Sequence, residues 1–258
     1  DSLAIRRRLE TVRHLTLLGG GISGLEAAVY GRDAGIEVAV VEKAPHVMAL
    51  QFGPAAAGAL ARRLRDQGVD LRTGRFVTDV AKSDGRLIVT LDNGEVLRSD
   101  LTLTTVGAVR NTSWFAQAGL RTDKGVLVDE CQRTSAPGVF ACGDIAQRDH
   151  LRTASIVRAA EQGRGAALNA MATLTGGPLE PVADRAIPLS FQHDRIEFHS
   201  AGIPAGPGLE EKILSNDGEG IYRSVVLEGN LLRGVQMVGS REGFRKLADS
   251  LGRFYPTP

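Results

Sequence analysis

Residues 15–43 read "LTLLGGGISGLEAAVYGRDAGIEVAVVEK", and this stretch decides the fold. Its first apolar run, within "HLTLLG", is too short for an amphipathic helix and predicts a buried strand. The next residues predict a helix over 22–34 that ends at Gly35, and "EVAVVEK" predicts a second buried strand. A strand, a helix and a strand in this order form the unit of a parallel sheet. The sequence therefore predicts an α/β fold with a Rossmann-like sheet.

Three glycines, Gly19, Gly21 and Gly24, satisfy the pattern G-x-G-x-x-G between this strand and this helix. In that context the first glycine allows a tight turn, the second lets the backbone approach a pyrophosphate, and the third lets the helix pack close to the strand. The helix N-terminus, with Ile22 and Ser23, presents free N–H groups to phosphates. We expect these five residues to bind a dinucleotide. The alternative is a glycine-rich turn without a ligand.

An acidic residue follows at the end of the second strand. Glu42 comes 18 residues after Gly24, near the spacing at which a carboxylate accepts the hydroxyls of an adenosine ribose. A 2′-phosphate would meet a like charge there, so Glu42 favours NAD(H) over NADP(H). Lys43, which we also place at the cofactor, weakens that preference. FAD uses the same fingerprint, so the motif alone does not choose the nucleotide.

The remaining sequence extends this sheet and adds a second region. Further elements are predicted as helices over 2–12, 55–67, 153–174 and 244–251, strands over 69–74, 101–107, 125–129 and 138–141, a three-stranded β-meander over 76–100, and antiparallel strands from about residue 190. A linker with Pro178, Pro181 and Pro188 precedes that antiparallel tail. The tail is expected to form a small α+β domain.

Composition limits the possible partners and the compartment. The formal net charge of +1 over 258 residues gives no electrostatic reason to bind nucleic acid or an anionic membrane. No apolar run approaches the roughly 18 residues of a membrane span, and the first residues do not resemble a signal peptide. We expect a cytoplasmic protein with no nucleic-acid or membrane partner.

The cysteines and histidines give no sign of a metal or a redox disulfide. Cys131 and Cys142 lie eleven positions apart, which fits neither a disulfide framework, a zinc site nor a C-x-x-C pair. Each is interpreted as a small buried hydrophobe. The five histidines do not cluster at metal-ligand spacing, so no metal site is expected.

Several motifs in a fixed order resemble one known family. "GGGISGLE" from Gly19, "GAVRNTSW" from Gly107 and "TSAPGVFACGD" from Thr134 match motifs in the second half of the pyridine-nucleotide–disulfide oxidoreductases, which are FAD-dependent NAD(P)H reductases. Arg110 stands where the family usually has proline. The resemblance runs over residues 15–147. It implies a site for NAD(H) at the glycine turn and part of a site for FAD.

The end of the sequence narrows the resemblance. "AAEQGRGAALNAM" from Ala159 and "YRSVVLEGNLLRGVQMVG" from Tyr222 are similar to rubredoxin-reductase-like and assimilatory nitrite-reductase-like members. Such relatives pass hydride from NADH to FAD and electrons on to rubredoxin, an iron–sulfur protein or a haem module. The lack of a C-x-x-C pair argues against glutathione- or thioredoxin-reductase chemistry.

Residue roles follow from the resemblance. It implies that Gly143 and Asp144 hold the flavin, and that Gln162 lies near the isoalloxazine as a catalytic residue. Glu26 would order the nicotinamide ring as the second catalytic residue, and Gly107 would contribute to cofactor binding. The alternatives are an exposed helix position for Glu26 and an Asx-turn or N-cap for Asp144.

The resemblance also implies three domains and an additional segment. Residues 1–122 would bind NAD(H), residues 123–180 would form the C-terminal portion of an FAD-binding domain, and residues 181–258 would form a small α+β interface domain. The family's N-terminal FAD half is expected from a longer polypeptide or a separate subunit, so the chain alone should bind NADH but hold FAD poorly. Two alternatives are a non-catalytic NAD-binding regulatory subunit without flavin, and a one-cofactor enzyme with FAD in the glycine turn.

Overall fold

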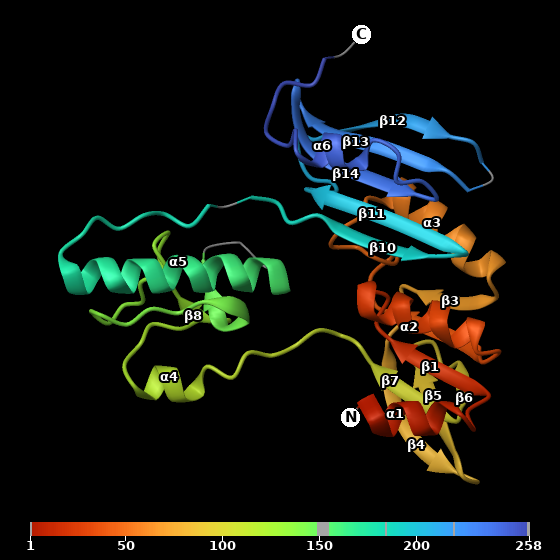
Figure 1. Cartoon of the computed structure of the whole chain (residues 1–258). Coiled ribbons are helices and arrows are strands. Elements are labelled where there is room, and N and C mark those ends of the chain that lie inside the picture. Colours follow the sequence, from red (N-terminus) through yellow and green to blue (C-terminus); the bar gives the residue numbers. More distant parts are fainter. Residues whose placement is uncertain (1, 149–154, 184, 219, 257–258) are drawn as a thin grey trace. The chain divides into compact units, whose positions relative to one another are not determined.

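The structure is a computed structural model that describes residues 2–148, 155–183, 185–218 and 220–256 (Figure 1). The chain divides into two compact units. Unit 1 comprises Asp1–Val106 and Pro188–Pro258, and unit 2 comprises Gly107–Ile187. These units do not coincide with the three expected segments, because residues 107–122 fall in unit 2 and the C-terminal tail joins the N-terminal part. The three-domain division stays a prediction.

A four-stranded parallel sheet forms the centre of unit 1 and confirms the predicted α/β class. Its strands, in spatial order, are β3 (Val69–Thr73), β2 (Glu37–Glu42), β1 (His14–Leu18) and β7 (Leu101–Thr104). The helices of this part are α1 (Ser2–Leu9), α2 (Ile22–Asp33) and α3 (Pro54–Asp66). β1 is the strand whose end leads into the glycine turn, and α2 begins directly after that turn.

The predicted β-meander is present between β3 and β7. It consists of β4 (Val77–Ser83), β5 (Arg86–Leu91) and β6 (Val96–Ser99), which pair antiparallel in that order. Positive φ angles at Asp84, Gly85 and Gly94 form its two tight turns. Val89 and Leu91 of β5 pack with Val41 of the parallel sheet in a small separate core.

The C-terminal tail folds as a five-stranded antiparallel sheet with one short helix. The spatial order is β10 (Leu189–His193), β11 (Ile196–Gly202), β14 (Leu231–Val238), β13 (Tyr222–Glu228) and β12 (Glu210–Asn216), and α6 is Phe244–Ala248. One face, with Phe198 and Tyr222, joins the core of the parallel sheet, and α3 contacts β11, β13 and β14. The opposite face, with Val225 and Val235, packs under Phe244 of α6.

Unit 2 contains little regular structure besides one long helix. Its elements are α4 (Ser113–Gln117), β8 (Val126–Leu127), the 3₁₀ turn η1 (Gly143–Ile145), β9 (Ala146–Gln147) and α5 (Ile156–Thr175). The strand predicted over 138–141 is not formed and shows only an isolated bridge between Arg133 and Phe140. The strand predicted over 125–129 shortens to β8. A two-stranded sheet offers these segments few pairing partners, so they stay irregular.

Helix α5 agrees with the prediction apart from its first turn. The predicted start at residues 153–154 lies outside the described residues. The Ser155 side chain accepts a hydrogen bond from the Arg158 N–H as the N-cap, and Gly176 ends the helix with a φ of 72°.

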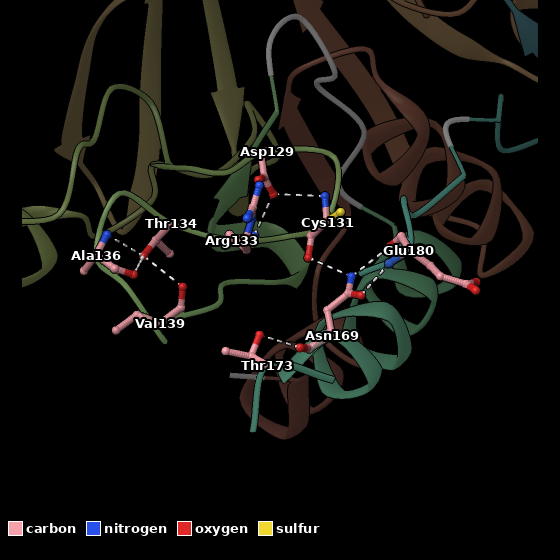
Figure 2. A network of polar contacts seen from close by, with 9 residues as sticks. All are labelled: Asp129, Cys131, Arg133, Thr134, Ala136, Val139, Asn169, Thr173 and Glu180. Atoms are coloured by element: carbon pink, nitrogen blue, oxygen red, sulfur yellow. Dashed lines mark hydrogen bonds and ion pairs between the residues drawn. The ribbon is translucent and has the colours of Figure 1, made fainter. Parts of the chain in front are cut away.

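A polar network attaches the neighbouring segments of unit 2 to α5 (Figure 2). The buried Asn169 donates through Nδ2 to the Cys131 carbonyl (3.0 Å) and to the Glu180 carbonyl (2.8 Å), and its Oδ1 accepts from the Glu180 N–H (2.8 Å). Asp129 organises the adjacent turn by accepting from the N–H groups of Cys131 and Arg133. One amide therefore joins three segments of the chain.

Candidate functional site

The glycine turn lies between β1 and α2, as predicted. Gly19 has a φ of 112°, and a Cβ built there would lie 2.7 Å from the Thr105 carbonyl oxygen. A Cβ at Gly24 would lie 2.0 Å from the Gly19 carbonyl oxygen. Both positions exclude any larger residue, because backbone atoms that cannot move away occupy the space of a side chain. Two of the three roles assigned to the glycines are thus met by the geometry.

The remaining glycine of the motif, Gly21, leaves the N-terminus of α2 open. Gly21 is the N-cap residue, with extended backbone and no side-chain cap. Apart from its chain neighbours and the backbone of α2, no atom of the described residues lies within 4 Å of a Cβ built there. The first N–H groups of the helix, which include those of Ile22 and Ser23, have no partner within an α-helix. This end of α2 can therefore accept an anionic group against the backbone.

Glu42 lies at the end of β2 beside this turn. Its Oε2 accepts from the Gly20 N–H and its Oε1 from the Ala44 N–H, both at 2.6 Å. Each carboxylate oxygen has a second lone-pair site, so the group is held in place while it can still accept from a hydroxyl. The spacing of Glu42 after Gly24 predicted its place at the cofactor, but the sequence did not predict the two hydrogen bonds from Gly20 and Ala44 that hold its carboxylate.

Lys43 and Glu26 lie near the glycine turn, and their side chains have different environments. Lys43 is exposed, and its ammonium group lies 5.7 Å from the centroid of the Phe76 ring. Glu26 is half-buried on α2, and burial raises the pKa of its carboxyl. Glu26 makes no hydrogen bond or ion pair within the described parts of the chain. Glu26 is thus not a fully exposed helix position, and its role at the nicotinamide ring stays a prediction.

The predicted flavin residues lie together in unit 2. The Gly143 N–H donates to Oε1 of Gln162 (2.9 Å), which is buried on α5. Asp144 is exposed, and its backbone carbonyl accepts from Nε of Arg110. Gly143, Asp144, Arg110 and Gln162 line one small pocket. Arg110, the residue that departs from the family motif, therefore holds the Gly-Asp turn, which sequence reasoning did not predict.

The predicted site residues fall into two groups. Residues of the glycine turn lie with Glu26 and Glu42 in unit 1, whereas Gly143, Asp144 and Gln162 lie in unit 2. Gly107, an exposed residue with a φ of 93°, stands at the start of unit 2. In the parts of the chain that the structure describes, no three metal-binding side chains lie together and no helix is long and apolar enough to cross a membrane.

Comparison with known proteins gives related reductases. The rubredoxin-NAD(+) reductase of Pseudomonas putida is 34% identical over 159 residues, which are 61% of this chain and 41% of that protein. The assimilatory nitrate reductase electron transfer subunit of Bacillus subtilis is 23% identical over 252 residues, 97% of this chain and 32% of that protein. The chain thus spans at most about two fifths of these two relatives.

Solved structures and a family profile agree with this relationship. A ferredoxin reductase from Rhodopseudomonas palustris superposes with a TM-score of 0.83 at 27% identity, over 98% of this chain and 64% of that one. The reductase of the covalent putidaredoxin reductase–putidaredoxin complex superposes with a TM-score of 0.83 at 26% identity, over 98% and 62%. The profile of the "Pyridine nucleotide-disulphide oxidoreductase" family matches residues 1–163. The chain therefore belongs to the pyridine nucleotide-disulphide oxidoreductase family.

Proposed function

We propose that this chain is the NAD(H)-binding part of an FAD-dependent NADH oxidoreductase that passes electrons to a redox protein. One observation carries the proposal: the glycine turn leaves the N-terminus of α2 open, and the carboxylate of Glu42 is fixed beside it. The related rubredoxin-NAD(+) reductase and ferredoxin–NAD(+) reductase components support it, since their names state reduction linked to NAD.

The residues of unit 1 fit a dinucleotide. The N–H groups at the start of α2 would bind the diphosphate, and the free lone pairs of Glu42 would accept the ribose hydroxyls. Glu26, half-buried and without a partner in the described chain, would face the nicotinamide ring. We infer a preference for NADH, because a 2′-phosphate would meet the Glu42 carboxylate.

The residues of unit 2 fit one side of a flavin site. The exposed carboxylate of Asp144 is available as an acceptor for a hydroxyl, and Gln162 fixes the turn by accepting from the Gly143 N–H. When both cofactors are bound, NADH supplies a hydride and FAD accepts it. The protein supplies orientation of the two groups and the exclusion of water.

Unit 2 also bears an exposed apolar surface on α5. Its buried apolar residues are small in number, and α5 exposes Ile156 (90%), Leu168 (65%) and Leu174 (81%). An apolar helix face of this kind marks an interaction surface. We propose that an FAD-binding segment covers α5. The electron acceptor would be rubredoxin, another iron–sulfur protein or a haem module.

Titration of the 258-residue chain with NADH, followed by its fluorescence, tests the proposal. The wild-type chain should bind NADH, and Glu42→Ala should raise the Kd at least about tenfold, as expected for the loss of a charged hydrogen-bond acceptor. Glu37→Ala serves as the matched control, because Glu37 is an exposed carboxylate at the other end of β2. A wild-type chain that binds no NADH, or equal affinity in Glu42→Ala, would contradict the proposal. Filling of the turn by FAD instead would favour the one-cofactor alternative.

A further inference from the structure

The segment over residues 43–53 connects β2 to α3 and packs against the glycine turn. The Ala44 N–H donates to Glu42, and the Met48 N–H donates to the Gly20 carbonyl (2.9 Å). Val47 is fully buried, and its Cγ1 lies 3.1 Å from a Cβ built at Gly20. We call residues 43–53 the ribose loop, and the first part of this loop therefore sets the position of both Gly20 and Glu42.

The other end of the ribose loop is attached to the C-terminal sheet. The Gly53 N–H donates to Oε1 of Gln236 on β14 (2.5 Å), and Nε2 of Gln236 donates to the Pro204 carbonyl (3.0 Å). Phe52 is 1% exposed, and its ring lies edge-on to Phe198 of β11 at 6.1 Å between centroids. The loop is thus anchored at one end to the glycine turn and at the other to the sheet.

The contact of Gln236 with Gly53 and Pro204 requires a side-chain amide, because one side chain must both accept and donate a hydrogen bond. Gln236 is fully buried, and its one side chain accepts from Gly53 and donates to Pro204. An apolar side chain of the same size would leave the buried Gly53 N–H and the partly buried Pro204 carbonyl without these partners, which is costly. Access of water to restore those bonds would require the Phe52–Gly53 end of the loop to move.

We propose that Gln236 is a positioning residue for the adenosine-ribose end of the NAD(H) site. It acts through Gly53 and the ribose loop on Gly20 and Glu42. The inference rests on the proposed function and assigns to the C-terminal sheet a part in binding the dinucleotide. Because coupling between two sites is reciprocal, NADH binding should in turn stabilise the contact between Gly53 and Gln236.

The variant Gln236→Met tests the inference, since methionine keeps the size of the side chain and removes both hydrogen bonds. Binding to the 258-residue chain is measured with NADH and with ADP-ribose after circular dichroism confirms folding. Both Kd values should rise by the same factor, about fivefold or more. The Kd for reduced nicotinamide mononucleotide, which lacks the adenosine ribose, should not change. A general loss of folding would instead raise the Kd values of all three ligands.

Val235→Ala is the matched control. Val235 precedes Gln236 on β14, is equally buried and packs on the opposite face against α6. Its Kd values should equal those of the wild type. Unchanged ADP-ribose affinity in Gln236→Met, or an equal loss in Val235→Ala, overturns the inference.

A measurement on the wild-type chain covers the case in which Gln236→Met does not fold. Hydrogen exchange of the Gly53 amide should slow when NADH is added. Exchange that slows at Met48 but not at Gly53 overturns the inference. A wild-type chain that binds no NADH refutes the proposed function itself, and with it the inference, before any variant is compared.

Discussion

At the scale of single residues, the polar side chains of unit 1 are fixed by burial and by a few partners. His199 on β11 is fully buried, where Nδ1 lies 3.0 Å from Ser190 Oγ and Nε2 lies 3.3 Å from a Glu197 carboxylate oxygen. Burial lowers the pKa of His199, and the charge of Arg241 lowers it further, while Glu197 acts in the opposite direction. The ring also packs against Phe244.

This burial predicts a pH dependence of stability with a defined sign. The pKa of His199 is lower in the folded chain than the value of about 6.5 expected in the unfolded chain. As the pH falls below about 6.5, His199 binds a proton in the unfolded chain but stays neutral in the folded chain. The free energy of unfolding therefore decreases towards acid pH, by at most about 1.4 kcal/mol per pH unit from this group.

Denaturant unfolding at about pH 7.5 and about pH 5.5 checks the expectation. The decrease between the two pH values should be smaller in His199→Gln than in the wild type. His46→Gln is the control, since it removes a histidine from the ribose loop and leaves His199 in place. An equal decrease in wild type and His199→Gln would show that other groups cause the pH dependence.

At the scale of elements, α5 organises unit 2 through one amide rather than through a large apolar core. Asn169 makes three hydrogen bonds to the backbone of Cys131 and Glu180, and Thr173 donates to the Asn169 carbonyl (2.8 Å). The turn over 129–133 and the segment around residue 180 contact the helix at this point (Figure 2). Loss of the amide should therefore release both segments together.

Asn169→Ala is expected to lower the free energy of unfolding of unit 2 by about 2 kcal/mol, because several backbone groups lose their partner. The sequence has one tryptophan, Trp114 on α4, so its fluorescence reports the unfolding of unit 2. Thr175→Ala, at the exposed end of α5, is the control and should change little. Equal midpoints for Asn169→Ala and the wild type would contradict this account of unit 2.

At the scale of the whole molecule, the two units differ in the size of their buried apolar cores. Unit 1 buries two large apolar clusters around its parallel and antiparallel sheets and a smaller one beside the meander. In unit 2, the described residues that are buried and apolar are Val126, Cys131, Ala146 and Ala166. A core of this size stabilises a segment of some eighty residues poorly. The exposed face of α5 is consistent with a covering segment.

The purified chain should therefore retain little FAD while it binds NADH. Flavin absorbance after desalting of the chain incubated with FAD measures this, and NADH titration of the same sample is the internal control. Addition of an FAD-binding segment from a related reductase should raise flavin retention. Stoichiometric, tightly held FAD on the chain alone would refute the proposed requirement for that segment.

The sequence predicted those parts of the fold and site that depend on short-range patterns. The apolar run before Gly19, the helix after it and the acid at residue 42 lie within thirty residues of one another, so their spacing alone indicated the β1–α2–β2 unit and the turn. The meander was equally predictable from its turn residues. Whether Glu26, Asp144 and Gln162 act on cofactors stays a prediction.

Short-range patterns did not predict features that depend on distant pairing. The strand expected over 138–141 is only an isolated bridge, because a strand forms where neighbours complete its hydrogen bonds. The contact of Gly53 with Gln236 joins residues 183 positions apart, and no local pattern records it. The same holds for the bond between Arg110 and the Asp144 carbonyl.

By itself the sequence determined the α/β class, the glycine turn and the acid beside it, because strand and helix periodicity and the lack of a glycine side chain act locally. Only the tertiary structure decided that the C-terminal sheet anchors the ribose loop and that α5 exposes an apolar face. Both depend on which surfaces meet after the chain has folded, since burial and hydrogen bonding between distant residues are properties of packing rather than of spacing.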